Sequence, residues 1–229
     1  MIYITGDIHR DIQRIKNICE KYNTTRNDVL IILGDACINF YGDERDDFLK
    51  ENISALPITV FCIHGNHEIR PQNIPSYIKL QYRCGTALGE LEYPNLLFGI
   101  DGEIYNFDGH RCLVIGGAYS PDKFQRIERG HHWWEDEQPD DKIKEIVNKK
   151  IDEYGRIIDI ILTHTCPLKY TPTEVFLPWI DQSKVDKSTE IWFDEIEGKV
   201  PYKTWFCGHW HTDKVIDRMR FMFNDVITL

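Results

Sequence analysis

The sequence predicts an α/β protein with mixed sheets, and two observations carry this prediction. First, short apolar runs alternate with helical patterns over residues 1–63, as in a sheet of parallel strands covered by helices. Second, short strands separated by Asp and Gly turns occupy residues 95–117, which indicates an antiparallel portion. No low-complexity linker divides the 229 residues, so we expect one domain spanning residues 1–229 with a substantial core.

The first part of the chain supplies the predicted parallel strands. Uninterrupted apolar runs, typical of strands buried on both faces, lie at residues 1–5, 29–33 and 58–63. The spacing of Ile12, Ile15 and Ile18 predicts a helix over residues 11–22. A second helix is predicted over residues 43–56, because its acidic first turn favours the positive end of a helix dipole.

The rest of the chain continues the pattern with further strands and two helices. Apolar spacing predicts helices over residues 140–155 and 188–198. Strands are predicted at residues 95–99, 102–109, 110–117, 156–164 and 202–209, followed by a closing hairpin at residues 214–224.

Polar residues follow five of the predicted strands, in the sequences GD, GD, GNH, TH and GH. Ligands of open α/β sheets bind beyond the carboxyl ends of the strands, so these side chains are expected on one rim. They are Asp7, His9, Asp35, Asn66, His67, His164, His209 and His211. Two carboxylates, one amide and five imidazoles suit divalent Mn, Fe or Zn, and they exceed the four ligands of one structural zinc. Two ions, typically about 3.5–4 Å apart, would use the set.

Each of these histidines alone would be explained more simply as a buried, hydrogen-bonded side chain, and only the set favours a metal site. The four other histidines fall outside the pattern and are expected not to bind metal: His64, His110, His131 and His132. Glu68 is expected to orient neighbouring groups rather than to bind metal.

The motifs D-x-H, GD, GNHE, TH and GHWH, in this order over residues 5–211, resemble those of the calcineurin-like metallophosphoesterases. The resemblance implies a four-layered αββα sandwich. It also implies two divalent metal ions, with Mn favoured and Fe, Zn or Ni as alternatives. The implied reaction is the hydrolysis of a phosphomonoester or a phosphodiester, and the resemblance does not decide between them.

The resemblance also implies a role for each motif residue. It assigns Asp7, His9 and His211 to the first metal, Asn66, His164 and His209 to the second, and Asp35 to both as the bridging carboxylate. A metal-bridging hydroxide would attack phosphorus in line. His67 would not bind metal but would assist the leaving group as a catalytic residue. Ile38 departs from the family pattern, which often has an acidic residue there, and we assign it no role.

The segment 116–140 has two interpretations. It could be a lid over the substrate, in which Arg126 and Arg129 meet phosphate oxygens and Trp133 and Trp134 stack on a flat group. It could equally be a long surface loop whose aromatic residues pack against the core.

Composition limits the partners. A net charge of −10 disfavours binding to duplex nucleic acid. The resemblance implies a phosphorylated small molecule, a nucleotide or a phosphoprotein as substrate. A nuclease of the same chemistry and a catalytically silent binding module remain as alternatives. The absence of an apolar run near 18 residues argues against a membrane span. Seven singly spaced cysteines and the lack of a signal peptide lead us to expect a cytoplasmic protein.

Overall fold

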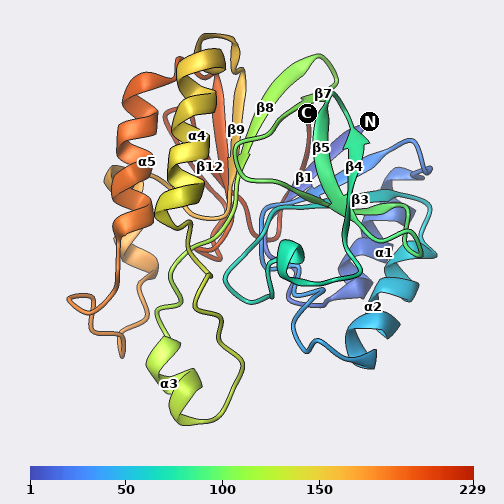
Figure 1. Ribbon diagram of the computed structural model, residues 1–229, viewed down its shortest axis with the longest axis horizontal. Helices are drawn as coiled ribbons and strands as arrows, with labels where there is room; N and C mark the ends of the chain where they lie inside the picture. The colour runs from blue at the N-terminus through green and yellow to red at the C-terminus, as the bar shows by residue number, and fades with distance from the viewer.

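The computed structural model describes residues 1–229 and contains two mixed β-sheets packed face to face. Helices α1 and α2 cover the outer face of the first sheet, and α4 and α5 cover the outer face of the second (Figure 1). The order of layers is therefore helices, sheet, sheet, helices. The four-layered αββα sandwich implied by the sequence motifs is confirmed.

The first sheet has seven strands in the order β13-β1-β2-β3-β6-β5-β4. Neighbours from β1 through β2 and β3 to β6 are parallel, whereas β13, β5 and β4 pair antiparallel with their neighbours. The strands are β1 (Ile2–Thr5), β2 (Val29–Ile32), β3 (Thr59–Cys62), β4 (Ile78–Tyr82), β5 (Gly85–Gly89), β6 (Leu96–Gly99) and β13 (Val226–Thr228).

The second sheet has six strands in the order β11-β12-β10-β9-β8-β7. Its central strands β12, β10, β9 and β8 are parallel, and the antiparallel hairpins β11–β12 and β7–β8 form its two edges. The strands are β7 (Ile104–Phe107), β8 (His110–Ile115), β9 (Ile160–Thr163), β10 (Thr204–Cys207), β11 (Lys214–Ile216) and β12 (Met219–Phe221).

Four longer helices and one short one connect these strands. They are α1 (Ile12–Tyr22), α2 (Glu44–Ser54), α3 (Lys123–Glu128), α4 (Asp141–Tyr154) and α5 (Ser188–Lys199). Aspartates cap three of them, because the side chains of Asp11, Asp43 and Asp140 accept hydrogen bonds from free N–H groups of the first turn. The four helices predicted from the sequence are confirmed within two residues at each end.

The antiparallel stretch predicted over residues 95–117 is confirmed only in part. Strands β7 and β8 form an antiparallel hairpin through Asp108 and Gly109, both of which have positive φ. Strand β6, however, runs parallel to β3 and is antiparallel only to β5. It therefore completes the parallel part of the first sheet.

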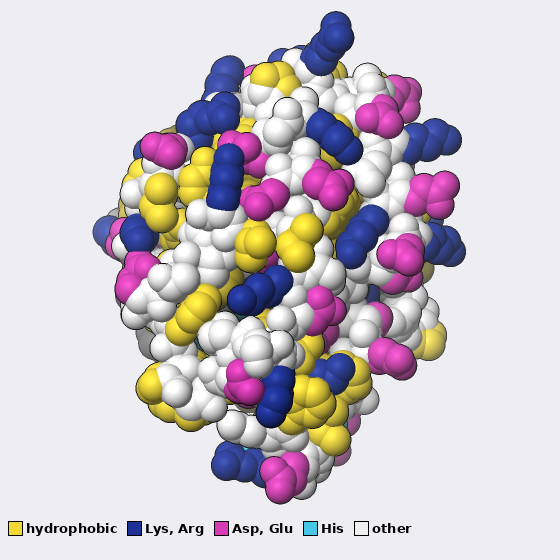
Figure 2. All heavy atoms as spheres, turned by 90° about the vertical axis from the view of Figure 1, so that its left-hand side faces the viewer, with side chains coloured by type: hydrophobic (Ala, Val, Ile, Leu, Met, Phe, Trp, Pro, Cys, Tyr) yellow, Lys and Arg dark blue, Asp and Glu magenta, His cyan; other side chains and the backbone are white.

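Apolar side chains form three buried layers that hold the sheets and helices in place. Ile15 and Ile53 belong to the layer under α1 and α2, Phe61 to the layer between the sheets, and Phe193 and Trp205 to the layer under α5. The outer face of α4 and α5 mixes both signs of charge with scattered apolar side chains (Figure 2). None of the helices has the length and apolar character needed to cross a membrane.

Candidate metal centre and its pocket

Five strands from both sheets deliver the polar motifs to one place. Strands β1, β2 and β3 of the first sheet precede Asp7 and His9, Asp35, and Asn66 and His67, and strands β9 and β10 of the second precede His164, His209 and His211. The side chains of Asp7, Asp35, Asn66 and His164 are almost completely buried there. Residues as far apart as 9 and 211 therefore come into contact, as the common rim predicted.

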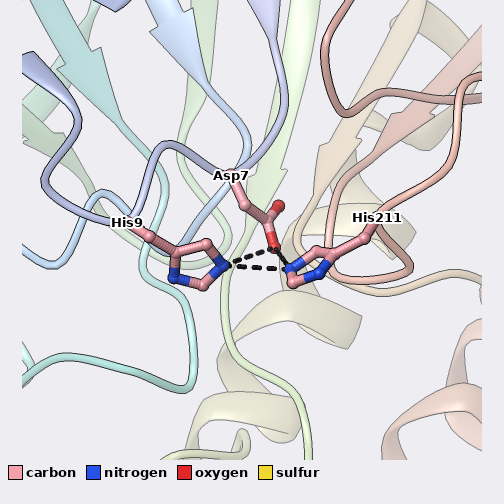
Figure 3. A group of neighbouring side chains, drawn as sticks. All are labelled: Asp7, His9 and His211. Atoms are coloured by element: carbon pink, nitrogen blue, oxygen red, sulfur yellow. Dashed lines mark hydrogen bonds and ion pairs between the residues drawn. The ribbon is translucent and has the colours of Figure 1, made fainter. Parts of the chain in front are cut away.

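One cluster consists of Asp7, His9 and His211 (Figure 3). The Nε2 atoms of His9 and His211 are 3.0 Å apart, and they lie 3.9 and 3.2 Å from Asp7 Oδ2. Asp7 Oδ2 is buried and has no hydrogen-bond partner. A buried carboxylate oxygen without a donor is costly, and two imidazole nitrogens directed at it complete a set of donor atoms for a cation.

A second cluster joins Asp35, Asn66, His164 and His209. His164 Nε2 lies 2.8 Å from Asn66 Oδ1 and 3.5 Å from Asp35 Oδ1, and His209 Nδ1 lies 3.1 Å from the same Asn66 oxygen. His164 Nδ1 is 2.8 Å from the backbone oxygen of Leu33. Because a carbonyl can only accept, Nδ1 carries a proton, and Nε2 is the ring nitrogen that faces the Asn66 oxygen and is available to a metal ion.

A proton or a metal ion at His164 Nε2 would satisfy the Asn66 oxygen, and the oxygen and nitrogen atoms gathered around it are those that a divalent cation takes as ligands. The opposite end of the Asn66 amide is fixed, because its Nδ2 donates to Ser120 Oγ at 2.9 Å. Ser120 Oγ in turn donates to Glu137 Oε2 at 2.5 Å. The Asn66 oxygen is thereby directed toward His164 and His209. Ser120 and Glu137 were not recognised in the sequence, because nothing local distinguishes them from other loop residues.

The charges of the site also fit divalent cations. Burial alone would raise the pKa of Asp35, but His67, His164 and His9 outweigh it and hold that pKa well below its usual range. Burial lowers the pKa of His209 to about 3, so its ring is neutral and can act as a ligand at neutral pH. Two carboxylates, one amide oxygen and four imidazoles form an oxygen and nitrogen donor set that suits two divalent ions.

The loops that carry these residues are tightly constrained. Asp35 and His209 adopt the left-handed backbone region, with φ of 46° and 67°, which is uncommon for residues other than glycine. A Cβ atom on Gly65 would lie 2.0 Å from Asp35 Oδ1, and one on Gly208 would lie 2.3 Å from Asp7 Oδ1. The glycines before Asn66 and His209 are therefore required by the close approach of the loops.

Glu68 connects two of these loops through hydrogen bonds to their backbone. Its carboxylate accepts hydrogen bonds from the backbone N–H of Gly65 at 3.3 Å and of Ile38 at 3.2 Å. The side chain is fully buried, and burial, with a further contribution from the Asp35 charge, raises its pKa to about 8. Glu68 therefore has the orienting position expected from the sequence.

His67 lies beside the clusters and faces open space. Its backbone N–H donates to Asp35 Oδ1 at 2.8 Å, and its Nε2 is 3.9 Å from Asp35 Oδ2. The imidazole is partly exposed and lines a pocket, and burial lowers its pKa. This position leaves the His67 ring free to meet a bound molecule.

The adjoining pocket has a volume of about 360 Å³, within the range of small-molecule sites. Site residues form its floor: His9, Asp35, Asn66, His67, His209 and His211. Much of its side comes from residues 167–187, the connection between β9 and α5, which we call the pocket wall. It contributes Thr171, Val175, Phe176, Leu177, Ile180, Gln182, Val185 and Lys187. Apolar residues within a Pro-containing loop are the only mark of this segment in the sequence, and they did not predict a place in the pocket.

Segment 116–140 contributes Tyr119, Pro121 and Asp122 to the pocket. Arg126 is buried in α3, where Nη1 donates to Ser120 Oγ at 3.3 Å, whereas Arg129 is exposed. Neither arginine lines the pocket, nor do Trp133 and Trp134. The Trp133 ring lies 4.0 Å from Lys123 Nζ, and Trp134 contacts Phe40.

Comparisons with known proteins agree with this architecture. A solved crystal structure superimposes with a TM-score of 0.54 at 13% identity, over 96% of this chain and 88% of that one. A second, the crystal structure of TT1561 of Thermus thermophilus, gives a TM-score of 0.54 at 12% identity, over 97% and 87% of the two chains. Such low identity shows a common fold alone. No curated protein matches the sequence.

The family model of the calcineurin-like phosphoesterases matches residues 1–213, which is most of the chain. This match spans every strand-end motif described above, from Asp7 to His211. The fold and the divalent-cation donor set are those expected of a metal-dependent phosphoester hydrolase. The chain therefore belongs to the calcineurin-like phosphoesterase family.

Proposed function

We propose that this protein is a dinuclear metal-dependent phosphoesterase that hydrolyses a phosphomonoester or a phosphodiester. The donor atoms around Asn66 Oδ1 carry the proposal, because His164 Nε2 and His209 Nδ1 lie 2.8 and 3.1 Å from that oxygen in a buried site. The unpartnered Asp7 Oδ2 supports a second cation position nearby. Asp35 lies between the two clusters and is suited to serve both ions.

Two divalent ions, when bound, would activate water and neutralise charge on the phosphoryl oxygens. The protein would hold them with Asp7, His9 and His211 on one side and with Asn66, His164 and His209 on the other. Asp35 would bridge the two groups. We propose Mn²⁺ as the metal, with Fe, Zn or Ni as alternatives that the same donor set can hold.

His67 is proposed to assist the leaving group. Its ring lines the pocket, so it can donate a proton to the leaving oxygen or stabilise the charge there. A role of Arg126 in phosphate binding stays a prediction, because its side chain is buried outside the pocket. For Arg129, Trp133 and Trp134, a role in a lid over the substrate remains a prediction.

The proposed substrate is a small phosphorylated molecule, a nucleotide or a phosphoprotein, in preference to duplex nucleic acid. The net charge of −10 supports this preference. Seven unpaired cysteines, six of them buried, support the proposal of a cytoplasmic location.

The decisive experiment measures hydrolysis of p-nitrophenyl phosphate and bis-p-nitrophenyl phosphate by the metal-stripped protein, before and after addition of Mn²⁺. Asp35→Asn should lose metal and activity together. His67→Ala should lower turnover by roughly 10²- to 10⁴-fold and leave the metal content intact. The preferred compound separates a monoesterase from a diesterase.

Two outcomes would contradict the proposal. If His67→Ala lost metal together with activity, His67 would be a ligand rather than a leaving-group catalyst. If no metal restored turnover although metal bound, the silent binding module would become the better description.

A further inference from the structure

The pocket contains a carboxylate that the proposed metal chemistry does not use. Glu190, in the first turn of α5, lines the pocket and is only 6% exposed. Its Oε1 accepts a hydrogen bond from Thr165 Oγ1 at 2.8 Å, whereas its Oε2 is buried and has no partner. A buried carboxylate oxygen needs a donor, and the pocket is the place from which a ligand could supply one.

An aromatic surface lies in the same pocket. The rings of Trp210 and Phe176 are 5.9 Å apart and inclined by 30°, and both residues line the pocket. Trp210 Nε1 is also buried without a hydrogen-bond partner. The surface therefore favours a flat group with an acceptor for the indole N–H.

The charge of Lys187 distinguishes between two kinds of ligand for Glu190, an organic cation and a neutral ring. An organic cation would pair with the carboxylate and with the aromatic rings, but Lys187 lines the same pocket and would repel it. A neutral flat ring with N–H donors on one edge and acceptors on another satisfies Glu190, Trp210 and Lys187 together.

We propose that the pocket binds a nucleobase of the guanine type, joined to the phosphate that reaches the metal centre, with Glu190 accepting from the base N–H groups. Guanine offers a ring N–H beside an exocyclic amine. Adenine offers only the amine, next to a ring nitrogen whose lone pair the carboxylate repels. Glu190 is thus a specificity-determining residue, and this inference rests on the proposed phosphoesterase function.

The test compares kcat/KM for guanosine and adenosine 5′-phosphates, as monoesters or as p-nitrophenyl diesters according to the class that the p-nitrophenyl assay establishes. The wild-type protein should prefer guanosine. Glu190→Gln should lower the guanosine-to-adenosine ratio by about ten-fold or more, because the charge-assisted contact to the base edge is lost. The matched control is Glu195→Gln, which removes the same charge from the exposed side of α5.

Phe176→Ala gives a second measurement that does not require Glu190 to be replaced. Loss of base stacking should raise KM for the guanosine ester about ten-fold. It should alter the metal content little, because Phe176 belongs to the pocket wall.

Three results would overturn the inference. The first is a wild-type enzyme that hydrolyses p-nitrophenyl esters but does not distinguish guanosine from adenosine. The second is an unchanged ratio in Glu190→Gln. The third is faster hydrolysis of phosphocholine than of either nucleotide, which would assign the pocket to an organic cation. Failure with every ester, p-nitrophenyl compounds included, would instead refute the proposed phosphoesterase function.

Discussion

The metal-binding rim, formed by the loops directly after β1, β2, β3, β9 and β10, differs sharply from the pocket wall at residues 167–187. Most of the rim is buried, although His9 and His211 are exposed, and a Cβ atom on Gly65 or Gly208 would collide with its neighbours. The pocket wall consists of 3₁₀ turns and irregular chain, and it exposes Leu177 and Trp179. The residues of the metal centre are therefore held rigidly, whereas the pocket wall is built from chain that tolerates more change.

This difference follows from how each region is stabilised. Rim loops begin at buried parallel strands, so two sheets fix their positions. The pocket wall is fixed chiefly by its own apolar contacts and by the docking of α5, because no strand passes through it. Substitutions in the rim should therefore lower both the unfolding free energy and the affinity for metal. Substitutions in the pocket wall should mainly lower the affinity for the ligand.

The largest effect is expected for Gly65→Ala. The new Cβ would lie 2.0 Å from Asp35 Oδ1 and 2.1 Å from its backbone nitrogen, and neither atom can move freely. We expect a loss of about 3 kcal/mol in unfolding free energy and weaker Mn²⁺ binding, measured by denaturant unfolding and metal titration. Gly198→Ala, in α5 with no atom within 4 Å of its Cβ, should instead stabilise by about 0.5–1 kcal/mol.

Metal binding should stabilise the rim by a similar amount. At a Mn²⁺ concentration of about 100 times Kd, one site adds about 2.7 kcal/mol to the unfolding free energy. Asp7→Asn should lower the unfolding free energy in chelator, because the imidazoles of His211 and His164 outweigh burial and lower the pKa of Asp7, so the folded state favours its carboxylate. The same variant should lose most of the Mn²⁺-dependent rise in Tm. An undiminished rise would show that Asp7 does not bind the metal.

The rim could be predicted from the sequence, but the pocket wall could not, and the reason is physical. Asp35 and Asn66 follow apolar runs that only a buried strand can explain, so their place at a strand end follows from local sequence. Phe176 and Glu190 come to line the pocket beside the metal centre only through tertiary packing. Nothing within residues 167–187 indicates which way that segment turns.

The hairpin of β4 and β5 was missed for a related reason. Ile78, Leu80 and Tyr82 do alternate as a strand requires, but the turn that follows is Arg83-Cys84. Both turn residues have positive φ, of 50° and 69°, a conformation usually occupied by Asn-Gly or Asp-Gly. The hairpin between β7 and β8 has the usual Asp-Gly, and the sequence predicted it.

Two tryptophans lie on either side of the boundary between the core and the pocket, and we expect them to differ in their contribution to stability. Trp205 is fully buried in β10, and its Nε1 donates to Thr163 Oγ1 at 2.7 Å. Trp205→Phe removes the donor to that hydroxyl, which still donates to the backbone oxygen of Thr165, and it leaves space in the core, so it should cost about 2 kcal/mol. Trp210→Phe removes an indole N–H that has no partner, so its unfolding free energy should change by less than about 0.5 kcal/mol. Equal losses in both variants would show that Trp210 is part of the structural core.

The smallest effect is expected for Trp179→Ala in the pocket wall. The side chain is 65% exposed, so its removal should change the unfolding free energy by no more than about 0.5 kcal/mol and leave Mn²⁺ affinity unchanged. Thermal unfolding and metal titration would check both. A loss of several kcal/mol in unfolding free energy would mean that the wall is as firmly fixed as the rim. Replacing a largely exposed residue has so large an effect only when that residue anchors its segment. The tolerance of the wall would then have to come from the side chains that face the pocket, and not from the chain that carries them.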